Sequence, residues 1–147
     1  MFRRTRVLHS LAIALLLASV SAHPARAAQA VRVTTNMGEF VIELNAERAP
    51  LTVANFLRYV NEGFYSGTLI HRVVGNFVIQ GGGHAAADYK LKPVHEPVVN
   101  ESGNGLQNKR GTVGLARSSG PHSGNSQFYV NIADNPSRVS SDGPGVR

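Results

Sequence analysis

Cysteine is absent from this sequence, and long apolar runs are scarce. Without thiols, the chain has no thiol nucleophile, no cysteine-ligated metal and no disulfide, so packing alone must stabilise its fold. The main apolar run, Leu11–Val20, is well short of the roughly 20 residues that a membrane-spanning helix needs. These absences exclude thiol enzymes and argue against a membrane anchor.

The first 27 residues have the three regions of a secretory signal peptide. Arg3, Arg4 and Arg6 form a basic start, and the apolar run follows them. Small residues then offer two cleavage patterns, Val20-Ser21-Ala22 and Ala25-Arg26-Ala27. We therefore expect an exported protein, in the periplasm, with no membrane anchor after cleavage.

The positive charge of the chain is concentrated in this leader. The formal net charge is +6, from 15 basic and 9 acidic residues. Cleavage after Ala27 removes four arginines and no acidic residue, which leaves 11 basic against 9 acidic residues and a net charge of +2. No basic stripe remains, so the sequence predicts no nucleic-acid partner.

Two early segments have clear periodicity. Alternating apolar residues between 31 and 44, interrupted by Asn36-Met37-Gly38, predict a β-hairpin. Between Pro50 and Asn61, apolar residues recur at i, i+3, i+4 and i+7, which predicts a helix, with Gly63 just past its end. The buried stripe of this helix is predicted to be Val53, Phe56, Leu57 and Val60.

The remaining sequence predicts short strands and loops. Residues 84–110 are predicted to form a long polar loop, and the tail 136–147 is predicted to be disordered because it has no apolar period. We expect Gly81-Gly82-Gly83 to end the second of four further strands. These strands are predicted at Leu69–Val74, Phe77–Gln80, Thr112–Ala116 and Gln127–Ile132. One helix against many short strands predicts a mainly β fold with α, either a barrel or a sandwich.

Three segments, in order, resemble the cyclophilin signature. They are Ile70-His71-Arg72-Val73-Val74-Gly75-Asn76-Phe77-Val78-Ile79-Gln80-Gly81-Gly82, Gly111-Thr112-Val113-Gly114-Leu115-Ala116-Arg117 and Ser126-Gln127-Phe128-Tyr129-Val130. The resemblance is to cyclophilin-type peptidyl-prolyl cis/trans isomerases, most of all to exported bacterial members, and runs from about residue 31 to residue 135. It implies a cyclophilin-like closed β-barrel with a capping helix.

The resemblance also implies segments that this sequence lacks. The family normally continues after Asn135 with further site residues, a strand, a second helix and a closing strand. We therefore interpret 31–135 as an incomplete domain followed by a non-family tail, 136–147, and hypothesise a frame shift or a gene fragment. Missing closing strands would expose strand edges and part of the core, so we expect the chain to be poorly soluble or partly unfolded.

The implied activity is rotation about X-Pro peptide bonds, which assists the folding of exported proteins and needs no cofactor. The barrier of about 18–20 kcal/mol arises from the double-bond character of the amide C–N bond. A fixed donor aimed at the amide nitrogen stabilises the twisted state more than either planar isomer. Arg72 corresponds to the family's catalytic arginine, and its guanidinium is always charged. The alternative is a surface arginine in an ion pair.

The resemblance assigns substrate binding to seven more positions. Gln80 and Gln127 would orient Arg72 and bond the substrate backbone, while 116–117 would pair with the substrate main chain. Phe77, Val78 and Tyr129 would form the proline pocket, with ordinary core packing as the alternative. The complete set is Phe77, Val78, Gln80, Ala116, Arg117, Gln127 and Tyr129.

Other signals are weak. No two of the histidines 71, 84, 95 and 122 have a spacing typical of metal ligands, so no metal site is predicted, and His71 is expected to be buried beside Arg72. Ser126 has no convincing base, which argues against a hydrolase. A monomer that acts on proline-containing polypeptides is expected. Two alternatives stay open, a proline-peptide binding or chaperone module without turnover and a non-functional fragment.

Overall fold

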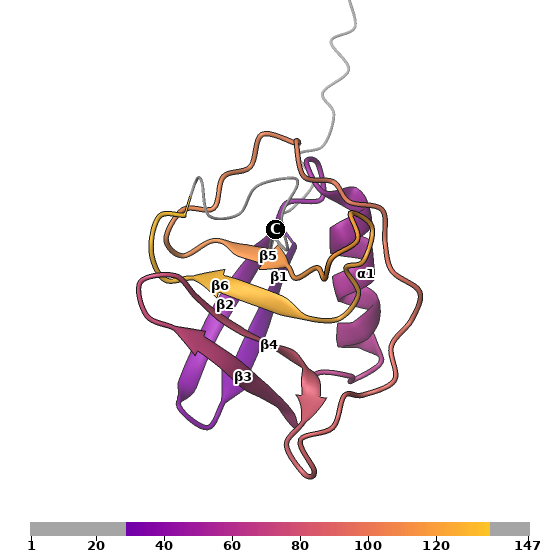
Figure 1. Ribbon diagram of the computed structural model, residues 1–147, viewed down its shortest axis with the longest axis vertical. Helices are drawn as coiled ribbons and strands as arrows, with labels where there is room; N and C mark the ends of the chain where they lie inside the picture. Colours follow the sequence, from indigo (N-terminus) through magenta and orange to yellow (C-terminus); the bar gives the residue numbers. More distant parts are fainter. Residues whose placement is uncertain (1–28, 136–147) are drawn as a thin grey trace, which may run out of the picture.

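The computed structural model describes residues 29–135. The predicted signal peptide, 1–27, and the predicted disordered tail, 136–147, lie outside the described residues. The described residues form two sheets and one helix, arranged as in Figure 1. The elements are β1 (Gln29–Thr35), β2 (Gly38–Leu44), α1 (Pro50–Asn61), β3 (Thr68–Val74), β4 (Val78–Ala85), β5 (Val113–Leu115) and β6 (Phe128–Asn131). Within this range, no helix has the length and apolar character to cross a membrane.

The two early predictions are confirmed. β1 and β2 pair antiparallel around a turn at 36–37, and α1 has the predicted bounds. Gly63 adopts a φ of 67°, the left-handed conformation that glycine allows just past a helix end. The buried helix face differs in part from the predicted stripe, because it includes Asn55 and Tyr59. Both side chains keep a polar tip bonded, as described below.

The other strands form one antiparallel sheet in the order β3-β4-β6-β5. The prediction that Gly81–Gly83 end the second strand is wrong, since β4 continues through them to Ala85. All three glycines are buried, and a Cβ at Gly81 would lie 2.6 Å from the Ile70 side chain. Glycine is therefore used here for close packing against neighbouring strands rather than for a turn.

The two faces of this sheet pack against different partners. Since side chains alternate along a strand, Phe128 and Val130 of β6 point to the opposite face from Tyr129. On the first face, Phe128 packs with Ile42 and Phe56, and so joins the sheet to the hairpin and the helix. In the view of Figure 1, β1 and β2 cross behind the four-stranded sheet. The described strands pair as these two sheets, and no ladder between 29 and 135 joins the sheets into a ring.

The long connection between β4 and β5 passes around the outside of α1 (Figure 1). Its Glu101 carboxylate accepts hydrogen bonds from the N–H groups of Leu51 and Thr52, at 3.0 and 2.7 Å. These N–H groups belong to the first turn of α1 and have no partner within the helix. A carboxylate at a helix N-terminus is also favoured by the helix dipole. The loop therefore caps the helix from a distant part of the sequence.

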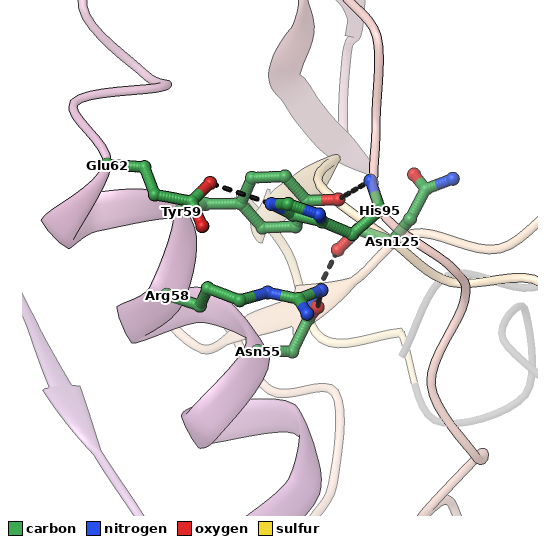
Figure 2. A network of polar contacts seen from close by, with 6 residues as sticks. All are labelled: Asn55, Arg58, Tyr59, Glu62, His95 and Asn125. Atoms are coloured by element: carbon green, nitrogen blue, oxygen red, sulfur yellow. Dashed lines mark hydrogen bonds and ion pairs between the residues drawn. The ribbon is translucent and has the colours of Figure 1, made fainter.

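Polar groups tie α1 to two loops (Figure 2). The His95 N–H donates to the Tyr59 hydroxyl at 2.8 Å, and His95 Nε2 lies 2.7 Å from Glu62 Oε2. The Asn55 amide donates to the Asn125 carbonyl at 2.6 Å and accepts from Arg58 at 3.2 Å. These bonds explain why Asn55 and Tyr59 are buried on a helix whose apolar stripe does not include them.

The segment that leads into β6 is held at a second point. The Tyr65 hydroxyl donates to the Ser126 carbonyl at 2.8 Å. Burial, and to a lesser extent nearby Tyr59, raises the pKa of Tyr65 above its ordinary value, so the hydroxyl stays a donor. The main chain of residues 125 and 126 is thus anchored directly before Gln127.

Candidate active site

One row of residues crosses the four-stranded sheet. Arg72 of β3 pairs with Gln80 of β4, Gln80 pairs with Tyr129 of β6, and Tyr129 pairs with Gly114 of β5. Residues directly opposite one another in adjacent strands project from the same face of a sheet. The fold thus brings three of the predicted site residues onto one face, the face opposite Phe128.

Hydrogen bonds connect the polar members of this row. Arg72 Nη1 donates to Gln80 Oε1 at 3.0 Å, and Gln80 Nε2 donates to Gln127 Oε1 at 2.9 Å. Because a guanidinium can only donate, Gln80 must turn its oxygen toward Arg72 and its NH₂ toward Gln127. Arg72, Gln80 and Gln127 are therefore connected in one relay of hydrogen bonds.

Arg72 is exposed and takes part in none of the ion pairs found between residues 29 and 135. Its guanidinium carbon lies 5.8 Å from the centroid of the Phe77 ring, within the range of a cation–π contact. The alternative of a surface arginine held in an ion pair thus has no partner among the described residues. A guanidinium without a carboxylate keeps N–H groups for a ligand.

The apolar residues predicted for the proline pocket gather beside this relay. Val78 and Tyr129 are fully buried and form a cluster with Ala116, and Phe77 packs against the cluster while remaining partly accessible. Phe77 is thus the member of the predicted pocket that offers surface next to Arg72. Val78 and Tyr129 are buried beneath Phe77, which is the position that the alternative of ordinary core packing predicts for them.

A buried asparagine network under this cluster was not predicted. The Tyr129 hydroxyl donates to Asn108 Oδ1 at 2.7 Å, and Asn131 donates to the same oxygen at 3.2 Å. Asn135 donates to the Phe77 carbonyl and to Asn131 Oδ1, both at 2.9 Å. The hydroxyl of Tyr129 was the available signal, since a buried hydroxyl needs a partner.

The predicted main-chain binding segment, 116–117, lies next to the cluster. The Ala116 N–H donates to the Gln127 carbonyl at 2.8 Å, so an internal bond already uses this donor. Arg117 Nη1 donates to the Pro121 carbonyl at 3.1 Å, while its Nε and Nη2 are buried without a partner in the described part of the chain. The segment is therefore close to Gln127, and its backbone is partly engaged in an internal bond.

A cavity of about 490 Å³ lies between β2, α1, the 98–108 loop and β5. Of the predicted site residues, Tyr129 and Arg117 line it, whereas Arg72, Gln80 and Gln127 do not. The cavity and the relay are thus separate features of the molecule.

Comparison with known proteins relates this geometry to a family. The model of cyclophilin type peptidyl-prolyl cis-trans isomerases matches residues 30–143. Peptidyl-prolyl cis-trans isomerase A of Dickeya dadantii is 49% identical over 105 residues, 71% of this chain and 55% of that protein. Peptidyl-prolyl cis-trans isomerase B of Escherichia coli is 50% identical over 101 residues, 69% of this chain and 61% of that protein. The chain therefore spans less than two thirds of the length of these relatives.

A solved structure is similar as well. The cyclophilin type peptidyl-prolyl cis-trans isomerase of Cryptosporidium parvum, determined in the presence of the dipeptide Ala-Pro, superposes with a TM-score of 0.63 at 27% identity. The match covers 78% of this chain and 73% of that one. The predicted fold class is confirmed by this similarity.

Proposed function

Because this chain belongs to the cyclophilin-type peptidyl-prolyl cis-trans isomerase family, we propose that it catalyses rotation about X-Pro peptide bonds, with Arg72 as its catalytic residue. The observation that carries the proposal is the hydrogen-bonded relay of Arg72, Gln80 and Gln127. The Arg72 guanidinium is bonded to the Gln80 amide and lies over the Phe77 ring. A proline ring that binds against Phe77 would therefore lie beside the fixed guanidinium of Arg72.

The chemistry needs no covalent step. As the amide twists, the nitrogen loses its resonance with the carbonyl and becomes a better hydrogen-bond acceptor. An Arg72 N–H directed at this nitrogen stabilises the twisted state and not the planar isomers, and only such differential stabilisation raises the rate. Phe77 supplies an apolar surface for the proline ring, and Gln80 holds the guanidinium in place while the bond turns.

The substrate class follows from the same reasoning. A site that combines an apolar ring surface with a single donor fits a proline residue within a polypeptide, and the Cryptosporidium relative was solved with Ala-Pro. We propose exported polypeptides as the substrates, because residues 1–27 have the pattern of a signal peptide. No cofactor is part of the proposal.

The proposal is tested by exchange NMR on an Ala-Pro peptide with the full chain. We expect the chain to accelerate cis–trans exchange, which takes tens to hundreds of seconds without a catalyst. Binding of the peptide without faster exchange would instead identify a proline-binding module without turnover. No binding and no acceleration would overturn both functions.

Gly83 lies against the Gln127 side chain, so a substitution there tests the relay directly. A Cβ at Gly83 would lie 2.6 Å from Gln127 Cγ and 2.7 Å from its Nε2, so alanine must displace the Gln127 side chain. Loss of the bond between Gln127 and Gln80 should lower kcat/KM by roughly tenfold, the value of about one hydrogen bond. Gly75→Ala is the matched control, because no atom lies within 4 Å of its Cβ position. Equal rates for the two variants in the exchange assay would contradict the role of the relay.

A further inference from the structure

Two histidines that are distant in the sequence lie together at the β3–β4 ladder. The rings of His71 and His84 have centroids 4.4 Å apart and planes tilted by 54°. His71, which was predicted to be buried, is exposed, and His84 is half-buried, so solvent reaches the pair. Their spacing in the sequence does not indicate a site, and only the fold brings the two rings together.

Irregular strand pairing explains the contact. The register passes from Ile70 opposite Gly81 to Arg72 opposite Gln80, which leaves His71 as the additional residue of a bulge in β3. A second irregularity lies between Thr68 and Ile70, where β4 carries the additional residues that include His84. Bulges redirect side chains, so both imidazoles point to the same place.

A main-chain bond to His84 leaves its other ring nitrogen open. His84 Nδ1 lies 3.0 Å from the Tyr89 carbonyl oxygen, and because a carbonyl only accepts, Nδ1 carries the proton and Nε2 holds the lone pair. The His71 ring lies close to the Leu69 backbone, which tends to raise its pKa. A ring N–H donated to a carbonyl is the arrangement that orients metal-binding histidines in proteins.

We propose that His71 and His84 bind one transition-metal ion of the class that prefers imidazole, Zn²⁺, Cu²⁺ or Ni²⁺. Each nitrogen lies about 2.0–2.1 Å from zinc in such sites. The 4.4 Å separation of the ring centroids brings the two imidazoles within reach of one ion. No group of three or more ligating side chains occurs among residues 29–135, so water completes the coordination. Ions that prefer oxygen, such as Mg²⁺ and Ca²⁺, are not expected to bind.

The electrostatic surroundings of His71 include one effect that favours metal binding and one that opposes it. Partial burial of the ring, followed by the neighbouring His84, lowers the pKa of His71, which favours the neutral form that binds a metal. The Arg72 charge, also close to His71, opposes a cation and limits the affinity. The resulting site is open and exchangeable rather than a closed structural zinc site.

The test uses the full chain and measures metal binding directly. Zn²⁺ is titrated by calorimetry, and Cu²⁺ is added for electron paramagnetic resonance, which detects coordinated nitrogens. His84→Asn is the informative variant, since its amide can still donate to the Tyr89 carbonyl while the Nε2 ligand is lost. We expect it, and His71→Asn, to weaken Zn²⁺ binding by at least about tenfold and to remove a nitrogen from the Cu²⁺ spectrum.

His122→Asn is the matched control, because His122 is exposed and lies outside the pair. It should bind both metals as the parent chain does. Thermal unfolding without metal shows whether each variant is folded. Equal affinity in the parent and in folded His84→Asn, or a loss shared by His122→Asn, would overturn the proposal.

Discussion

Arg72→Ala is expected to reduce the isomerisation rate by about 10²–10³-fold, the loss typical of removing one donor that acts on the transition state. The side chain is exposed and its hydrogen bond to Gln80 is the main internal contact, so the fold should lose about 1 kcal/mol or less. Affinity for an Ala-Pro peptide should change much less than kcat, since the donor acts on the twisted state. Exchange NMR separates these two quantities.

Two further variants make this result specific. Arg72→Lys keeps the charge but loses the rigid fork that both bonds Gln80 and faces the ligand, so its rate should lie between those of the parent and the alanine variant. Arg32→Ala removes another exposed strand arginine, which pairs with Glu39 at 3.1 Å on β1 and β2. It should leave the rate unchanged. If Arg72→Ala and Arg32→Ala isomerise equally well, Arg72 is not the catalytic donor.

The sequence predicted the secondary structure correctly where a single apolar periodicity was clear. The hairpin alternates strictly, and the helix at 50–61 has a proline at its start and a glycine after its end, so local signals and tertiary packing agree. The resemblance to a family motif then selected Arg72, Gln80 and Gln127, which the fold places in one bonded relay.

The failures have a common physical cause, since each depends on contacts between distant segments. Glycine usually ends a strand, but Gly81–Gly83 continue β4 because neighbouring strands pack where side chains would be. Asn55 is a polar residue at a buried helix position, where its side-chain amide donates a hydrogen bond to the Asn125 carbonyl. Similarly, the two bulges that bring His71 to His84 leave no periodic signal in the sequence. Local patterns do not carry such information.

The largest loss of stability is expected from Phe128→Ala. The Phe128 ring is 8% exposed and packs edge-on against Phe56 and Tyr65, with centroids 6.0 and 5.7 Å apart. It joins the sheet to the helix and the hairpin, so its removal leaves a cavity where three units meet. Such truncations cost about 3–5 kcal/mol, against about 5–15 kcal/mol of total stability in a typical domain. Thermal unfolding followed by circular dichroism should show a much lower midpoint or no cooperative transition.

Two comparisons isolate the packing contribution. Phe128→Leu keeps most of the volume, so it should lose clearly less stability than the alanine variant. Met37→Ala removes a large side chain that is 89% exposed in the hairpin turn, and should stay within about 0.5 kcal/mol of the parent. Because Phe128 projects from the face of the sheet opposite Gln80 and Tyr129, the isomerisation rate should fall only as the folded fraction falls. A Phe128→Ala chain that unfolds at the parent's midpoint would show that this cluster does not hold the sheet, the helix and the hairpin together.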